Sequence, residues 1–169
     1  MNSGLPPRIL TTRGQFAEKA YSAQLSLAAM PRVQQALEGD EAKIQVEMEL
    51  SWDTQWRRPS MRLAISLTVL LQCQRCMQPM HWSTDLVNHL LLDSGTGDFE
   101  GPEGVDIAQA EEGEVDTLRL IEDEILLALP LAPLHASNTP CGKTVVDEQA
   151  GEARAENPFA ALAALKTKH

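Results

Sequence analysis

The feature that most constrains the fold of this sequence is a strict alternation of apolar and polar residues in two stretches near its middle. From Ile44 to Trp52, every second residue is apolar, and the same period of two returns from Leu63 to Leu71. Successive side chains of a strand point to opposite faces of a sheet, so this period predicts two strands with one buried face each. The polar turn between them, DTQWRRPS, joins them most simply into an antiparallel hairpin.

A third apolar run, from Met80 to Leu92, follows the short CQRCMQP turn and is expected to return beside the second strand. Apolar residues then recur at helical spacing over 116–129, which predicts a helix with Asp116 or Thr117 as its N-cap. The fold class is therefore α+β, an antiparallel sheet of the central hairpin plus a third strand, packed by one main helix. Weaker patterns predict strands within 5–12 and 20–28 and a short helix over 30–37.

Charge is unevenly distributed along the 169 residues. The net charge is −10, and residues 91–169 alone carry −11. We expect a single α+β domain over 1–142, in which residues 93–114, rich in Gly, Asp and Glu, form an acidic flexible loop. Residues 143–169 are expected to be a polar linker that ends in a short apolar helix.

The N-terminus and the hydropathy pattern indicate a soluble, cytoplasmic protein. The first residues, MNSGLPPRIL, lack the apolar core of a secretory signal. The run from Ile125 to Leu134 is too short to span a membrane and is interrupted by Pro130 and Pro133. The acidic balance and an aromatic content of 4% argue against a general coat on nucleic acid, but they leave room for a local basic patch. Neither a membrane nor a small-molecule substrate is expected as a partner.

Three cysteines are too few for a secreted disulfide scaffold, and two of them, Cys73 and Cys76, form a C-x-x-C turn at a strand end. Such a turn brings two thiolates to one side and can chelate zinc. His135 and Cys141 would complete a tetrahedral set of three Cys and one His around a structural zinc ion, with His81 as the alternative fourth ligand. Without a metal, the thiols would be reduced small side chains packed at the strand end.

Thiol chemistry is the enzymatic alternative for the same cysteines. A redox C-x-x-C normally opens a helix, whose dipole lowers the pKa of the first thiol. Here a strand precedes Cys73, and Pro79 follows Cys76 closely, which disfavours that arrangement. The sequence also contains no Gly-rich phosphate loop, no G-x-S-x-G and no H-E-x-x-H. A non-enzymatic role is therefore expected, with a zinc-dependent or thiol-redox enzyme as the competing class.

Two charged groups are candidates for binding a partner. The first is a group of arginines that could contact RNA phosphates, and Trp56 could stack on a base beside them. It consists of Arg57, Arg58, Arg62 and Arg75. The second is a group of consecutive acidic residues, expected on the outer side of the predicted helix, where they could bind a basic protein. It consists of Glu122, Asp123 and Glu124. The alternatives are a solvated arginine loop and a solvated acidic face.

Three segments, in this order, resemble the YceD family of large ribosomal RNA subunit accumulation proteins of bacteria and plastids. They are LQCQRCMQPM at 71–80, EDEILLALPLAPLH at 122–135 and NPFAALAALK at 157–166. The resemblance implies a role in the synthesis, processing or stability of the large-subunit ribosomal RNA, hence in ribosome biogenesis. The implied partners are ribosomal RNA or a pre-ribosomal particle, reached directly or through a basic ribosomal protein. A protein-only adaptor without RNA contact is the remaining alternative.

Overall fold

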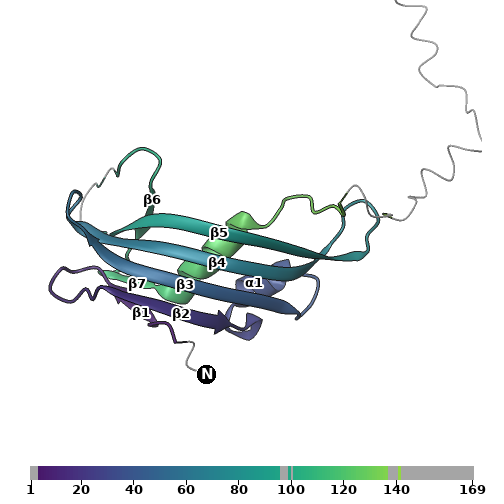
Figure 1. Ribbon diagram of the computed structural model, residues 1–169, viewed down its shortest axis with the longest axis horizontal. Coiled ribbons are helices and arrows are strands. Elements are labelled where there is room, and N and C mark those ends of the chain that lie inside the picture. The colour runs from purple at the N-terminus through teal and green to yellow at the C-terminus, as the bar shows by residue number, and fades with distance from the viewer. Residues whose placement is uncertain (1–3, 96–98, 100, 137–140, 142–169) are drawn as a thin grey trace, which may run out of the picture.

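The computed structural model describes residues 4–95, 99, 101–136 and 141. A five-stranded sheet forms its main layer, in the order β2-β3-β4-β5-β6 (Figure 1). The strands are β2 (Lys19–Leu25), β3 (Ala42–Asp53), β4 (Arg58–Gln72), β5 (Pro79–Asp93) and β6 (Asp106–Gln109). The three long strands β3, β4 and β5 pair antiparallel, which confirms the predicted hairpin and third strand.

Both α-helices pack on one face of this sheet. The main helix, α2 (Thr117–Ala128), crosses the strands from behind in Figure 1 and packs against the short helix α1 (Pro31–Ala36). A 3-10 turn, η1 (Leu27–Ala29), leads into α1, and a ribbon of β1 (Arg8–Leu10) with β7 (Glu114–Asp116) leads into α2. The side chain of Asp116 caps α2 by accepting a hydrogen bond of 3.0 Å from the N–H of Arg119. No helix among the described residues is both long and apolar enough to cross a membrane.

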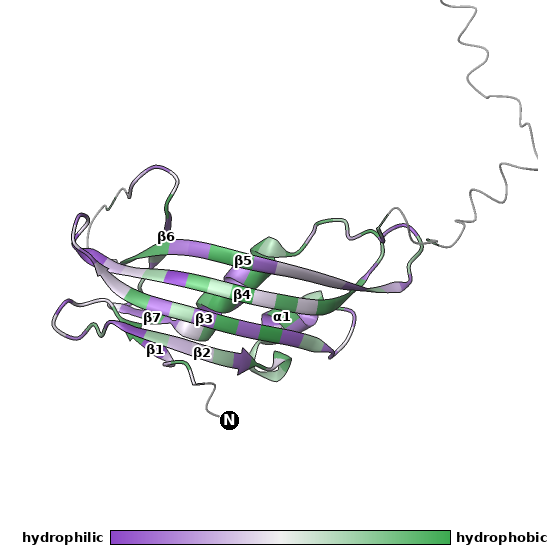
Figure 2. Ribbon diagram, viewed as in Figure 1, coloured by the Kyte–Doolittle hydropathy of each residue, from purple (hydrophilic) through white to green (hydrophobic). Residues whose placement is uncertain are grey.

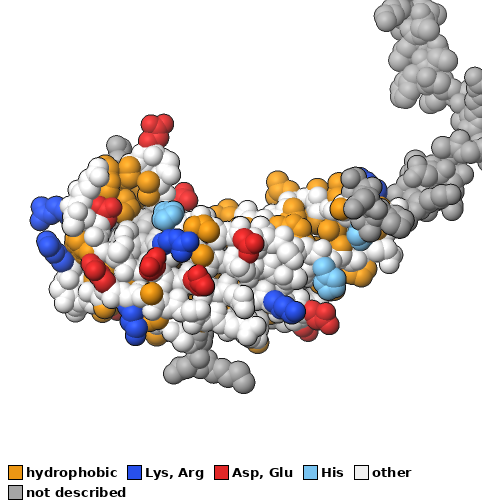
Figure 3. All heavy atoms as spheres, viewed as in Figure 1, with side chains coloured by type: hydrophobic (Ala, Val, Ile, Leu, Met, Phe, Trp, Pro, Cys, Tyr) orange, Lys and Arg blue, Asp and Glu red, His pale blue; other side chains and the backbone are white. Residues whose placement is uncertain are grey.

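The core lies between the sheet and α2, and it explains the alternation in the sequence. The strands β3 and β4 bury every second side chain, among them Ile44, Val46, Met48, Leu63, Ile65 and Leu67. These side chains belong to one cluster with Ile121 and Ile125 of α2, both fully buried. Figure 2 shows the alternation as green and purple bands along the strands. The opposite face of the sheet, which is the face seen in Figure 3, is largely polar with charges of both signs.

Two details of the predicted sheet are wrong. The sheet is mixed, because β6 pairs in parallel with the end of β5, where Leu90 lies opposite Asp106. In addition, β6 and the first residue of β7 come from the stretch 93–114, which was expected to be a flexible acidic loop. A four-residue strand carries too few apolar side chains to stand out in such a stretch, and β6 exists because the long neighbour β5 supplies its hydrogen-bond partners. The predicted linker and helix of 143–169 lie outside the described residues.

Candidate metal centre and charged surfaces

The C-x-x-C turn follows β4 and is closed by two backbone hydrogen bonds. The N–H of Met77 donates to the carbonyl of Cys73 at 2.9 Å, and the N–H of Cys73 donates to the carbonyl of Gln78 at 3.0 Å. Met77 takes a φ of 56°, in the left-handed region that tight turns use. The turn therefore reverses the chain direction between β4 and β5 with Cys73 and Cys76 at its base.

The segment that follows α2 reaches the same turn. The N–H of Gln74 donates to the carbonyl of Pro133 at 2.8 Å, which brings His135 and Cys141 to the two thiols. Three contacts link the side chains: Cys73 Sγ to Cys141 Sγ at 3.6 Å, Cys76 Sγ to His135 Nδ1 at 3.4 Å, and Cys141 Sγ to His135 Nδ1 at 3.7 Å. All four ligand atoms lie within 4.8 Å of one another. The predicted meeting of the turn with the segment 130–141 is confirmed at Pro133, His135 and Cys141, and His81 is not in the group that the described residues form.

The geometry of this Cys/His cluster suits a tetrahedral metal ion. Bonds of about 2.3 Å from zinc to sulfur and about 2.0 Å to nitrogen, at tetrahedral angles, place two sulfurs roughly 3.8 Å apart and a sulfur and a nitrogen roughly 3.6 Å apart. The observed separations of 3.4–3.7 Å agree with both values. Thiolate and imidazole ligands also favour zinc over magnesium or calcium, which prefer oxygen. The cluster can therefore hold a metal ion of the zinc type.

The local environment shifts the pKa values of two thiols of the cluster, Cys73 and Cys141, in opposite directions. Burial acts to raise the pKa of the Cys73 thiol, and it is the largest single effect on that group. Hydrogen bonds from the backbone amides of Cys76, His135 and Arg75, together with one from the side chain of His135, outweigh burial and lower the pKa of this thiol to about 5. Burial, as the largest cause, and the neighbouring thiols of Cys73 and Cys76 together raise the pKa of the Cys141 thiol to about 11. At neutral pH the metal-free cluster therefore combines a thiolate at Cys73 with a neutral thiol at Cys141.

The four predicted RNA-contact arginines do not form one group. Arg57 and Arg58 lie at the start of β4, whereas Arg75 lies in the turn beyond its end. β4 has 15 residues, so at about 3.3 Å per residue these two ends are roughly 45 Å apart. Arg62 lies between them on the polar face of the sheet, opposite Glu49 of β3. Only Arg57 and Arg58 are neighbours.

Arg58 is held against the sheet by two contacts. Its guanidinium lies 2.5 Å from the carboxylate of Asp93, whose side chain is only 5% exposed. The same guanidinium stacks over the ring of Phe99, 3.9 Å from its centroid. Arg57, by contrast, is exposed and takes a φ of 54°. Of this pair, Arg57 is thus the residue that faces solvent.

The prediction that the three consecutive acids share the outer side of the helix is wrong. Glu122 is buried and accepts a hydrogen bond of 2.9 Å from the N–H of Arg32 in α1. Asp123 pairs with the guanidinium of Arg32 at 2.5 Å. Glu124 accepts a hydrogen bond from the side-chain amide of Asn88 in β5. Because α1 lies on one side of α2 and the sheet on another, residues that fan around the helix meet different polar partners.

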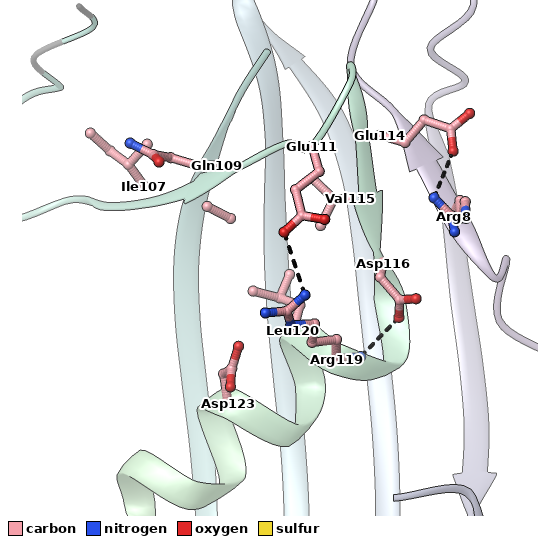
Figure 4. Close-up of a pocket in the computed structure, with 11 residues that line it drawn as sticks. Arg8, Ile107, Gln109, Glu111, Glu114, Val115, Asp116, Arg119, Leu120 and Asp123 are labelled. Atoms are coloured by element: carbon pink, nitrogen blue, oxygen red, sulfur yellow. Dashed lines mark hydrogen bonds and ion pairs between the residues drawn. The ribbon is translucent and has the colours of Figure 1, made fainter. Parts of the chain in front are cut away.

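Asp123 and three acidic residues that the sequence pattern did not group with it surround a cavity of about 440 Å³ beside α2 (Figure 4). The carboxylates around it belong to Glu111, Glu114, Asp116 and Asp123. Two of these carboxylates form exposed ion pairs, Arg8 with Glu114 at 3.1 Å and Arg119 with Glu111 at 3.4 Å. The lining residues come from β1, β6, β7, the turn before β7 and α2, so no local motif marks the cavity.

Two comparisons with known proteins, one with family models and one with individual sequences, give the same description. The family model described as large ribosomal RNA subunit accumulation protein YceD matches residues 61–166, more than half of the chain. A protein of that description from Haemophilus influenzae is 32% identical over 115 residues. The match covers 64% of this chain and 66% of the relative, which is slightly less than two thirds of its length. No solved structure matches the chain significantly.

Proposed function

This chain belongs to the YceD family of large ribosomal RNA subunit accumulation proteins, and on that premise we propose that it is a ribosome biogenesis factor. It supports the synthesis, processing or stability of the large-subunit ribosomal RNA. It does so in the cytoplasm, by binding and not by catalysis. Its partners are ribosomal RNA or a pre-ribosomal particle, contacted directly or through a basic ribosomal protein.

The observation that carries the non-enzymatic part of the proposal is the number of ligands in the Cys/His cluster. Four protein ligands complete the tetrahedral shell of zinc, whereas catalytic zinc sites keep one position open for water or substrate. Cys73 and Cys76 follow β4, and His135 and Cys141 follow α2. A zinc ion held by these four residues would fasten the two segments together. We therefore assign the cluster a structural role.

One observation favours the competing class, a thiol oxidoreductase. The pKa of the Cys73 thiol is lowered to about 5, as in reactive thiols. However, Cys73 has an exposed fraction of 0%, so a disulfide substrate has no access to its sulfur. The motif also forms a turn between two strands and does not open a helix. A depressed pKa at a buried thiol suits a metal ligand, which must be deprotonated to bind.

A basic ribosomal protein would meet Asp123 first among the predicted docking residues. The Asp123 side chain is 44% exposed, whereas Glu122 and Glu124 are hydrogen-bonded to Arg32 and Asn88 within the chain. Asp123 also borders the acidic cavity shown in Figure 4. We propose this cavity as the place where a lysine or arginine of the partner would compete for the carboxylates.

The proposed function is tested by depleting the protein and following the large-subunit ribosomal RNA. Depleted cells should contain less mature large-subunit RNA relative to small-subunit RNA, and expression of the full chain should restore it. Unchanged precursor and mature RNA after depletion would overturn the biological assignment.

A pull-down of the full chain, with and without nuclease, separates the two kinds of partner. Association that survives nuclease indicates direct contact with a ribosomal protein, and association that is lost indicates contact through RNA. Elemental analysis of the same preparation tests the structural role of the cluster. Bound zinc with thiols that resist alkylation is expected, whereas metal-free protein with a reactive Cys73 would favour the oxidoreductase.

A further inference from the structure

A second cavity, of about 560 Å³, lies at the end of the sheet opposite the Cys/His cluster. The segments that follow β1, join β3 to β4, follow β5 and precede β7 converge on it (Figure 1). We propose that this end of the sheet binds a single-stranded segment of RNA, with arginines on the phosphates and a tryptophan against an unpaired base. The choice of RNA as the ligand rests on the proposed function, whereas the place of the site rests on the geometry.

Aromatic side chains are scarce in the chain but gather at this end. The sequence contains 3 Trp, 3 Phe and 1 Tyr, and four of these side chains are here: Phe16, Trp52, Trp56 and Phe99. The ring of Trp52, which lines the cavity, lies 5.9 Å from that of Phe16, centroid to centroid. All four side chains are only partly buried, so ring surface stays accessible. Partly exposed aromatic rings of this kind can stack on unpaired bases.

Two guanidinium groups beside these rings are free to bind phosphate. The guanidinium of Arg13 lies 5.4 Å from the centroid of the Trp52 ring, and Arg57 is exposed in the β3–β4 turn. Neither forms an ion pair with a carboxylate among the described residues. Glu112 is the one acidic residue in the lining of the cavity, against three arginines, of which Arg58 is paired with Asp93. The carboxylates of Glu18 and Asp53 lie beside the lining, where they accept hydrogen bonds from backbone N–H groups of Trp52, Gln55 and Trp56. Arg13 and Arg57 are therefore the cations that a phosphate can reach here. Figure 3 shows Lys or Arg side chains projecting from this end, at the left of the view, close to hydrophobic atoms.

The turn that presents Arg57 has a defined shape. The side chain of Asp53 accepts hydrogen bonds of 2.8 Å from the N–H of Gln55 and 2.9 Å from the N–H of Trp56. Arg57 follows in the left-handed region, which residues with a Cβ rarely adopt. The neighbouring Arg58 is anchored to Asp93 beneath the turn. Because hydrogen bonds within the chain already hold the turn, little conformational entropy is lost when a phosphate binds.

Single-stranded RNA fits this surface better than an acidic peptide does. A peptide carboxylate would engage the arginines but leave the face of Trp52 unused, whereas a nucleotide offers a phosphate and a base together. Duplex RNA keeps its bases stacked and so cannot use the ring either. Because Arg13 and Arg57 are the free cations here, only about two phosphates are neutralised, and the logarithm of the affinity should change by about −1.4 per tenfold rise in salt.

The test measures the anisotropy of a labelled, single-stranded RNA of about 12 nucleotides with the full chain, and of the same RNA in a duplex. The single strand should bind more tightly than the duplex. Trp52→Ala should weaken its binding at least about fivefold with an unchanged salt slope, and Trp52→Phe should restore most of it. Arg57→Ala should reduce the slope by about 0.7, because one phosphate contact is lost.

Two control variants make the result specific to this end of the sheet. Lys43→Ala changes an exposed side chain of β3 opposite Thr68, toward the other end of the sheet, and should bind the RNA as the wild type does. Arg57→Glu changes an exposed side chain and tests the site without relying on the packing of Trp52. Equal binding by wild type and Arg57→Glu, or no preference for the single strand, would overturn the inference. If depletion leaves ribosomal RNA unchanged while these variants still lose RNA binding, the proposed function fails and the site stands.

Discussion

The carboxylate of Glu122 accepts a hydrogen bond of 2.9 Å from the backbone N–H of Arg32, so that α2 caps α1. The N-cap residue of α1, Met30, provides no side-chain acceptor, and Pro31 at its first position has no N–H. The N–H of Arg32 is therefore the first backbone donor of α1 that needs a partner. Glu122, only 6% exposed, supplies the missing acceptor from a helix 90 residues away in the sequence.

We expect Glu122→Ala to lower the free energy of unfolding by about 1–3 kcal/mol, because the N–H of Arg32 is then left unpaired in a partly buried place. Glu122→Gln keeps an acceptor oxygen, so its free energy of unfolding should fall by less than that of Glu122→Ala. Urea unfolding at neutral pH measures both variants. Asp123→Asn is the matched control. The ion pair between Asp123 and Arg32 is exposed, so this variant should lower the free energy of unfolding by less than about 1 kcal/mol. Equal losses at the two positions would contradict the capping role.

Glu124 should make stability fall as the pH rises. Partial burial raises the pKa of its carboxyl above 4.5, and the charges of Asp106 and Asp123 add to the rise, against the hydrogen bond from Asn88. The folded state therefore holds this proton more tightly than the unfolded chain. The contribution of Glu124 is fully present below the unfolded pKa of 4.5 and is lost as the pH rises through the folded pKa.

Glu124→Gln removes this titration, so it should be more stable than the wild type at neutral pH, by less than about 1 kcal/mol because the site is partly solvated. Near pH 4 the two proteins should be about equally stable. Urea unfolding across this pH range provides the comparison. A variant that is less stable than the wild type at neutral pH would show that the ionised Glu124 contributes favourably.

Zinc binding near neutral pH should release the proton of Cys141 and none from Cys73. The pKa of the Cys73 thiol is about 5 and that of Cys141 about 11, so only Cys141 of these two enters the reaction protonated. Zinc affinity should accordingly rise with pH through the neutral range. Calorimetric titration of the metal-free chain in two buffers with different enthalpies of ionisation counts the protons.

The cysteine variants serve as controls for that count. Cys141→Ser should release one proton fewer than the wild type, whereas Cys73→Ser should bind zinc more weakly with an unchanged proton count. An unchanged count in Cys141→Ser would contradict the assignment of the proton to Cys141.

Arg58→Ala should destabilise the fold by about 3 kcal/mol, since it leaves the carboxylate of Asp93 buried without its partner. Arg57→Ala, at the next position but exposed, should change the free energy of unfolding by no more than about 0.5 kcal/mol. Thermal or urea unfolding of the two variants tests the contrast. A small effect of Arg58→Ala would show that water reaches Asp93 and replaces the guanidinium.

The central strands and α2 could be predicted because their signals are local. Alternation along β3 and β4 and helical spacing along α2 each reflect one buried face within a single segment. The strand β6 has no such signal, because its four residues pair only with the end of β5. The cysteine turn could be recognised from its spacing, and the side chains of His135 and Cys141 were candidate ligands by residue type alone.

Charged residues could not be placed in the same way. Arg57 and Arg75 are 18 positions apart in the sequence, yet an extended strand separates them across the sheet. Glu122 and Asp123 are adjacent, but one is buried under α1 and the other borders an open cavity. The gathering of Trp52, Arg13 and Arg57 joins two turns that no motif connects.

By itself, the sequence of this protein determined where the central strands and the main helix form and which of their faces are buried. Those properties follow from the periodicity of apolar residues, which acts over a few neighbours. Only the tertiary structure decided which charges are paired and which stay free, because an ion pair or a hydrogen bond depends on the distance between two segments in space. Arg32 and Glu122, for example, are 90 residues apart in the sequence. That difference leaves Arg13 and Arg57 facing solvent at one end of the sheet, while the thiols, one imidazole and a turn meet at the other.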